Sequence, residues 1–246
     1  MEVITEIWRR ATAVQPPPTP EVVGAIAILG LVLVLYRRSW LITRLLVTIT
    51  HEGAHALAAL LAGRRLSGIR LNSDTSGLTV SRGKTRGPGM VIMLAAGYLG
   101  PAAAGLGAAA LLAAGHSVGL LWLLVLLLSL MLLMIRNAYG VLVLVVAGGL
   151  VFAISWLLAP AWQSAVAYLI TWLLLIAAPK PVIELIAMRR QRRDRGSDVD
   201  QLARLTRVPG GLWAVLFLLC NLAGLALGTA VLLPSLIALF RPMFTP

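Results

Sequence analysis

The chain contains little charge and few of the side chains that enzymes use for chemistry. Only 12% of its 246 residues are charged, against about 25% in an ordinary soluble domain, whereas 59% are hydrophobic. It has three histidines, nine acidic residues and a single cysteine, Cys220, which excludes an intramolecular disulfide. The low charge excludes an ordinary soluble domain, and the scarcity of histidine and acid leaves few candidates for a metal site.

Long apolar runs make up most of the chain instead. A helix crosses a bilayer with about 20 apolar residues, and seven runs come close to or exceed that length. The composition therefore predicts an all-α polytopic membrane protein with about seven transmembrane helices, which form a single membrane-embedded domain over residues 21–246. The expected spans are residues 21–36, 41–63, 89–114, 118–135, 138–158, 161–178 and 211–234.

Residues 1–20 are expected to form a separate N-terminal segment. Apolar residues recur at helical spacing in its first half, which predicts a short helix lying in the membrane interface. A proline cluster between Pro16 and Pro20 then breaks that helix before the first span.

The formal net charge of +12 is unevenly distributed along the chain. If the N-terminus is placed in the cytosol, seventeen lysines and arginines fall on the inner side and four on the outer side, a positive-inside pattern. The basic residues are expected to set topology and to contact anionic lipid, mainly in a cytosolic loop over about 179–210. They adjoin spans and carry little aromatic interleaving, so no nucleic-acid partner is expected. The high content of Leu, Ala, Arg and Gly favours a bacterial plasma membrane.

The clearest chemical signal is a pentapeptide inside a predicted span, His51-Glu52-Gly53-Ala54-His55. Positions i and i+4 share one face of a helix, so the two histidines can bind one Zn²⁺, and Glu52 can act as general base on a zinc-bound water. Glu52 is the only acidic residue deep in an apolar span, where an ionisable group costs about 2.5–3.5 kcal/mol. That cost favours a metal site over the alternative, a polar cluster that joins helices by hydrogen bonds.

A polar segment with a different residue pattern follows the motif. Residues 66–80 alternate apolar and polar on both sides of an Asn/Asp/Ser/Gly cluster, which predicts a β-hairpin over about 66–82. An exposed strand edge beside the motif could bind an extended protein substrate. The alternative is a plain connecting hairpin at the membrane surface. Asp74, at the tip, is expected to serve the turn.

A catalytic zinc needs a third protein ligand and an open position for water. His116 is expected in an outer loop, Glu184 at the inner face, and Asp194 among solvated arginines. Asp198 and Asp200 remain, at the start of a short helix that leads into the last span. Both could instead cap that helix against its dipole, and spacing alone leaves the two interpretations open.

Five features occur in order: the His-Glu-x-x-His helix, the hairpin, Ala96–Pro101, Arg136-Asn137-x-x-Gly140 and Ser197–Leu202. Together they resemble the site-two protease superfamily of intramembrane zinc metalloproteases, most closely its divergent "B-like" branch, over roughly residues 40–235. The resemblance implies a His-His-Asp zinc site with Asp198 as third ligand and Asp200 as the alternative. It also implies that Gly97 and Pro101 lie where helices approach closely around the site. Asn137 is implied near the substrate or the site, with a helix-end cap as the other interpretation.

The motif and the resemblance together imply an intramembrane zinc metalloendopeptidase. It would hydrolyse peptide bonds of transmembrane or membrane-associated proteins by Glu52-assisted attack of zinc-bound water. The chain lacks the Asn-x-x-Pro and Leu-Asp-Gly sequences usual around the third ligand. That departure supports the alternative, a catalytically inactive membrane scaffold or binding protein with the same fold. The predicted topology also leaves Asp198 near the inner surface and His51 part-way along its helix, so the two must be brought together.

Overall fold

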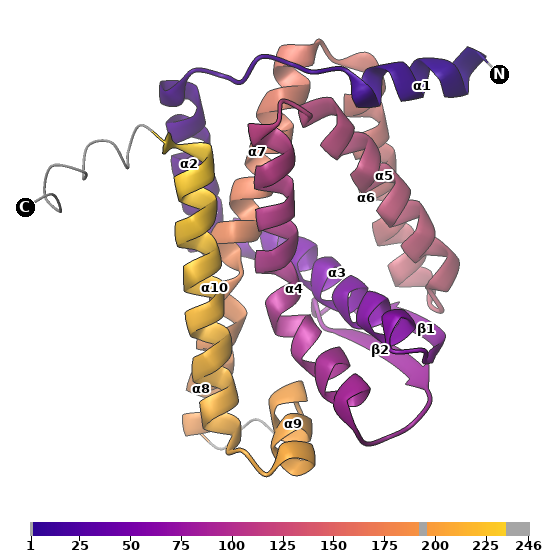
Figure 1. Cartoon of the computed structure of the whole chain (residues 1–246), viewed down its shortest axis with the longest axis vertical. Helices are drawn as coiled ribbons and strands as arrows, with labels where there is room; N and C mark the ends of the chain where they lie inside the picture. The colour runs from indigo at the N-terminus through magenta and orange to yellow at the C-terminus, as the bar shows by residue number, and fades with distance from the viewer. Residues whose placement is uncertain (1, 192–195, 235–246) are drawn as a thin grey trace, which may run out of the picture.

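The structure, a computed structural model, describes residues 2–191 and 196–234, which form a bundle of helices with one small sheet at its periphery (Figure 1). These residues form ten α-helices and one antiparallel β-hairpin. The elements are α1 (Glu2–Thr12), α2 (Pro20–Leu35), α3 (Arg37–Leu61), β1 (Arg65–Leu71), β2 (Gly77–Arg82), α4 (Pro88–Ala113), α5 (Ser117–Met134), α6 (Ala138–Leu157), α7 (Pro160–Ala177), α8 (Pro179–Arg190), α9 (Asp198–Thr206) and α10 (Gly210–Leu232). The predicted all-α polytopic class with a small hairpin is confirmed.

The predicted number of seven spans is not confirmed. Five helical segments in the described residues are long and apolar enough to cross a membrane, and the bent pair of α2 and α3 brings the number to six if the pair is one broken span. Tyr36 takes an extended conformation between the two helices, which meet at 101°. With only 16 residues, α2 is roughly 24 Å long. It is therefore shorter than the bilayer core and continues into α3 instead of crossing alone.

Residues 179–190, expected as part of a basic loop, continue the preceding span as α8. Pro179 and Pro181 stand in the first turn of α8, where the missing backbone N–H groups leave no hydrogen bond unmade. The second half of the expected loop contains α9. Its apolar side, with Val199 and Leu202 fully buried, packs in one cluster with Leu94 of α4 and Phe217 of α10. The last two helices are thereby joined to α4.

The N-terminal segment and the hairpin lie at opposite ends of α4 (Figure 1). The backbone N–H of Gln15 donates to the carbonyl of Gly115 (2.8 Å), just beyond the C-terminal end of α4, whereas β2 precedes its N-terminal end. The 26 residues of α4 separate these ends by roughly 39 Å. Residues 9–10 and 64–86, which were expected to share one membrane face, therefore lie at opposite ends of α4.

The hairpin runs from Arg65 to Arg82, close to the predicted range of 66–82. Its register shifts between Leu66 and Gly68, where Gly68 has φ +154 and a Cβ would lie 2.4 Å from the Arg136 side chain. Only glycine fits that bulge without displacing its neighbour. At the tip, Asp74 accepts hydrogen bonds from the Ser76 N–H (2.9 Å) and hydroxyl (2.6 Å), so it serves the turn as expected.

The outer edge of β1 is covered by the connection between α5 and α6. Ile135 forms a parallel bridge with Ile69, and the Arg136 N–H donates to the Ile69 carbonyl (2.9 Å). The Asn137 amide donates to the Leu71 carbonyl (2.6 Å) and its oxygen accepts from the Leu71 N–H (3.2 Å). Of the two strands, β2 is therefore the one whose outer edge has no strand partner among the described residues.

Candidate metal centre

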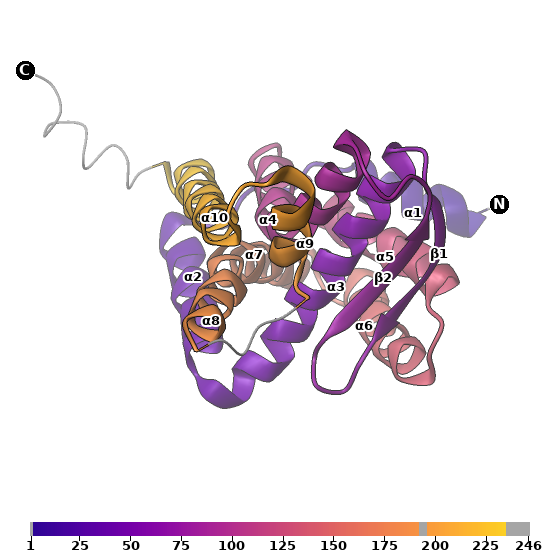
Figure 2. The same cartoon turned by 90° about the horizontal axis from the view of Figure 1, so that it is seen from below.

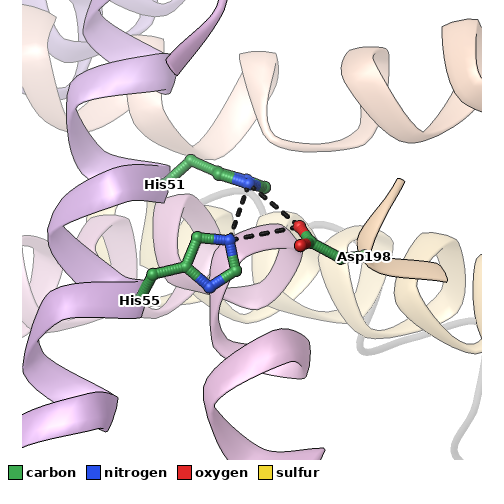
Figure 3. Close-up of side chains that lie close together, drawn as sticks. All are labelled: His51, His55 and Asp198. Atoms are coloured by element: carbon green, nitrogen blue, oxygen red, sulfur yellow. Dashed lines mark hydrogen bonds and ion pairs between the residues drawn. The ribbon is translucent and has the colours of Figure 1, made fainter. Parts of the chain in front are cut away.

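Three side chains from two distant parts of the chain converge on one point (Figure 3). The Nε2 atoms of His51 and His55 lie 3.0 Å apart, and Asp198 Oδ2 lies 3.3 Å from the first and 3.1 Å from the second. Among the described His, Cys, Asp and Glu residues, this is the group of three that could hold a metal ion. Helix α3 supplies both histidines through the i, i+4 spacing, and the first turn of α9 supplies the aspartate.

The protonation of His55 makes this cluster a site for a cation. Its Nδ1 lies 2.7 Å from the Met93 carbonyl, which can only accept, so Nδ1 carries the proton. The Nε2 atom of neutral His55 then has a lone pair, and it lies 3.1 Å from Asp198 Oδ2, which is also an acceptor. Two acceptors this close repel each other unless a cation or an extra proton lies between them. The Met93 contact is also the type of hydrogen bond that orients a metal-ligating histidine.

The donor set fits zinc in chemistry and in spacing. Imidazole nitrogen and carboxylate oxygen are zinc ligands at about 2.0–2.2 Å, and tetrahedral geometry then places ligand atoms roughly 3.4 Å apart. The observed separations of 3.0 to 3.3 Å are close to that value. Gly97 of α4 faces the same point, where a Cβ would lie 2.4 Å from His55 Nε2 and 2.6 Å from the His51 ring. Only a residue without a side chain leaves this space open.

Asp198 occupies the predicted position of the third ligand, and Asp200 does not. Burial raises the pKa of Asp198, but hydrogen bonding to His51 and His55 outweighs it and leaves that pKa well below its usual value. The carboxylate is therefore held in the ionised form that a metal requires. Asp200 instead pairs with Arg189 of α8 and accepts a hydrogen bond from the Gly196 N–H (3.0 Å).

The other acids and the third histidine weighed as ligands lie elsewhere. Glu184 accepts a hydrogen bond from the Trp40 indole (3.0 Å), and His116 begins α5 at the opposite end of α4. Asp194 lies outside the described residues. Within residues 2–191 and 196–234, the His-His-Asp group is thus the one that matches the expected ligand set.

The site lies close to one end of the bundle, which explains how Asp198 and His51 can meet. Gly97 lies nine residues into α4, roughly 14 Å from the end nearest the hairpin. Figure 2, viewed from that end, shows α9 beside α3 and α4, with the hairpin on the far side of α3. Helix α9 therefore covers the bundle at this end, and its first residue reaches the histidines of the strongly tilted α3.

Glu52 lies between α3 and β2 and is only 4% exposed. One carboxylate oxygen accepts a hydrogen bond from the Thr79 hydroxyl (2.6 Å), and that hydroxyl also lies 3.1 Å from the Glu52 carbonyl. A Cβ on Gly77 would lie 2.5 Å from the Glu52 side chain, so the strand backbone approaches it closely. The hairpin therefore fixes the position of the candidate general base.

An open pocket of about 460 Å³ lies over the cluster. Its walls come from α3, from residues 77–81 of β2, from the first turns of α4 and from the start of α9. Tyr98 closes one side, with its ring 5.0 Å from that of His51 in an edge-to-face arrangement. Water can therefore reach the cluster from the pocket.

Two residues expected near the site have other surroundings. Asn137 pairs with β1 and is not among the residues that line the pocket. Pro101 is buried inside α4, one turn beyond Gly97, and is also absent from the pocket wall. The close approach of α3 and α4 is real, because a Cβ on Gly100 would lie 2.4 Å from that of Ala54. The motif did not predict the contact of Thr79 with Glu52. The only indication in the sequence was that Thr79 lies in the hairpin that follows the motif.

A family model described as Peptidase M50B-like matches residues 24–228. The chain belongs to this family. The match includes His51, Glu52, His55 and Asp198, and it bears out the resemblance to the B-like branch of the site-two protease superfamily. Searches of curated proteins and of solved structures gave no significant match. The protein is thus an integral membrane protein with the fold of an M50B-like peptidase.

Proposed function

We propose that the protein is an intramembrane zinc metallopeptidase that hydrolyses peptide bonds of membrane-associated proteins. The observation that carries the proposal is the meeting of His51, His55 and Asp198 at distances of 3.0 to 3.3 Å. Membership of the M50B-like family supports the same conclusion. The two histidines and the aspartate would hold Zn²⁺ on three sides and leave a fourth position toward the pocket.

Each side chain of the site has a separate role in the proposed reaction. A bound zinc ion would polarise the scissile carbonyl and make a neighbouring water molecule more acidic. The carboxylate of Glu52 accepts a proton from the attacking water and later donates it to the leaving amide nitrogen. Thr79 keeps one Glu52 oxygen occupied, so the other is the proton carrier. Met93 holds the His55 ring in the tautomer that leaves Nε2 free.

The outer edge of β2 is the proposed place for the substrate backbone. That edge borders the pocket beside Glu52, whereas the edge of β1 is covered by residues 135–137. A peptide that pairs with β2 must be extended, which exposes carbonyl groups that a regular helix keeps in hydrogen bonds. A transmembrane substrate would therefore unwind locally before cleavage. Proline substitutions in a cleaved substrate, placed where its N–H should donate to β2, test this pairing through loss of cleavage.

The end of the bundle that carries the site is proposed to face the cytosol of a bacterial cell. The segment from Arg64 to Arg86 contains six basic residues at this end, whereas α1 contributes Arg9 and Arg10 at the other. The positive-inside rule then places the N-terminal helix on the outer side. This is the reverse of the orientation inferred from the sequence, and it follows from the broken α2–α3 span.

Labelling of new protein N-termini in membranes tests the proposed activity without a known substrate. Cells that make the wild type are compared with cells that make Glu52→Gln, which keeps the shape of the side chain but cannot take up a proton. We expect cleavage products in or beside transmembrane segments that are absent with the variant. Identical N-termini in the two membranes, with metal bound in both, would instead favour the catalytically inactive scaffold.

A further inference from the structure

Two arginines face each other directly across the hairpin. Arg65 of β1 and Arg82 of β2 are Cα partners in the antiparallel register, and both are exposed. Residues at such positions point to the same face of a sheet, with Cβ atoms about 4.5–5.5 Å apart. Like charges placed directly opposite each other destabilise a strand pair. A two-stranded sheet has little stability of its own. An anion bound between the two arginines would relieve their repulsion and stabilise the hairpin.

Neither arginine has a hydrogen-bond or ion-pair partner among the described residues. Their neighbour Arg64 shows the contrast, because its guanidinium donates to the Ser81 hydroxyl (2.9 Å) and to the Lys84 carbonyl. The acid nearest along the hairpin, Asp74, lies at the far tip and bonds with Ser76. The protein itself therefore supplies no counter-charge that the structure shows for Arg65 and Arg82.

The face that carries the pair is also apolar. Leu78 and Val80 alternate with inward residues along β2, and their exposed fractions are 55% and 44%. Both therefore lie on the face of Arg82, and Arg70 lies on it opposite Leu78. The chain enters the membrane-spanning α4 at Pro88, six residues after Arg82. Arginines beside exposed aliphatic side chains at the end of a span match the boundary between lipid headgroups and acyl chains.

We propose that Arg65 and Arg82 together bind the phosphate of an anionic phospholipid on this face of the hairpin. Each guanidinium can donate two parallel hydrogen bonds to phosphate oxygens, and one phosphate between the two relieves their repulsion. Leu78 and Val80 then contact the lipid below its headgroup. The opposite face of the same hairpin holds Glu52 through Thr79, so the lipid would steady the strand beside the pocket.

A lipid fits this face better than an acidic protein segment. An acidic peptide would satisfy the arginines but would leave Leu78 and Val80 in contact with water, whereas a phospholipid covers both kinds of side chain. Leu78 and Val80 alternate along β2 with Thr79, which bonds Glu52, so their side chains point away from that carboxylate even though β2 also lines the pocket. The proposal is independent of catalysis and concerns the protein with or without peptidase activity.

Native mass spectrometry of the detergent-solubilised full chain tests the site. The affinities for phosphatidylglycerol and for phosphatidylcholine are measured for the wild type, for Arg65→Gln/Arg82→Gln and for Lys84→Gln/Arg86→Gln. The last variant is a matched control, because Lys84 and Arg86 are also exposed at the hairpin end of the bundle, and their side chains have no partner among the described residues. A guanidinium that bonds the phosphate directly is worth about tenfold or more in affinity, so we expect roughly hundred-fold weaker phosphatidylglycerol binding for the hairpin pair.

The control pair is expected to lose clearly less, because only the general attraction of its charges is removed and no hydrogen bond to the phosphate is lost. Arg65→Lys/Arg82→Lys, which keeps the charge but not the paired hydrogen bonds, should fall between the wild type and the glutamine variant. Equal losses for the hairpin and control pairs would overturn the proposal. So would displacement of the lipid by inorganic phosphate or by a poly-glutamate peptide at the same concentration of negative charge, which would point to a soluble anion or to a protein partner.

Discussion

Asp200 forms an ion pair with Arg189 of α8. It lies two residues after Asp198, the aspartate that contacts the two histidines. Asp198 and Asp200 both lie in the first turn of α9, yet only Asp198 points to His51 and His55. Asp200 also accepts the Gly196 N–H, so it joins the start of α9 to the end of α8. Its position indicates that it holds Asp198 in place while lying outside the His-His-Asp group.

Substitution of this pair should weaken metal binding without removing it. We expect Asp200→Asn and Arg189→Gln each to lower zinc affinity by roughly 10–100-fold, the range typical of groups that orient a ligand. Competition with a chromophoric chelator measures the affinity. The absorption of the Co²⁺-substituted protein should keep the intensity of four-coordinate cobalt. A cobalt spectrum as weak as that of Asp198→Ala would show that Asp200 is itself a ligand.

Gly97 should not tolerate even one added methyl group. In Gly97→Ala the new Cβ would lie 2.4 Å from His55 Nε2, so we expect loss of bound metal while the helix remains folded. Gly107→Ala is the matched control on the same helix, because nothing lies within 4 Å of the added Cβ there. Alanine should stabilise that position by about 1 kcal/mol. Metal analysis and thermal unfolding of the two variants side by side give the comparison, and normal metal content in Gly97→Ala would contradict the site.

Thr79 should affect catalysis through Glu52. Thr79→Val removes the hydrogen bond that fixes the Glu52 carboxylate, and we expect about a tenfold lower kcat with unchanged zinc content. The control is Thr48→Val, which breaks another contact between α3 and the hairpin, the 2.7 Å hydrogen bond to the Thr75 carbonyl. Equal loss of activity in both variants would mean that Thr79 only supports the hairpin.

The two ends of the bundle should differ in their access to reagents. In a Cys220→Ser background, a membrane-impermeant maleimide added to intact cells should label Ala13→Cys but not Thr85→Cys. Both positions are exposed, one after α1 and the other between the hairpin and α4. Labelling of Thr85→Cys from outside would reverse the proposed orientation. Labelling of both after cell lysis confirms that each thiol is reactive.

The sequence predicts those parts of the site that depend on local spacing. The i, i+4 separation places His51 and His55 on one face whatever the tertiary structure, and the alternating residues after the motif form the hairpin as predicted. Asp198 was reached only through the resemblance to a family, because a spacing of 143 residues carries no geometric information. Its choice over Asp200 depends on where α9 packs.

The number of crossings could not be read from hydropathy. The apolar run that ends at Leu35 is as hydrophobic as a span, but its crossing is completed by α3 after a bend at Tyr36. Hydropathy measures the preference of each run for lipid and contains no angle between consecutive helices. The same limit explains Asn137, whose amide lies on the edge of β1, a partner 66 residues away in the chain.

Zinc per chain in the purified wild type, measured beside His55→Ala, Asp198→Ala and Asp200→Ala, tests the central claim most directly. The account predicts close to one zinc in the wild type, its loss in His55→Ala and Asp198→Ala, and its retention at saturating zinc in Asp200→Ala. A folded wild type that binds no zinc when the metal is supplied would contradict the metal centre and leave the two histidines and Asp198 as a hydrogen-bonded link between α3 and α9.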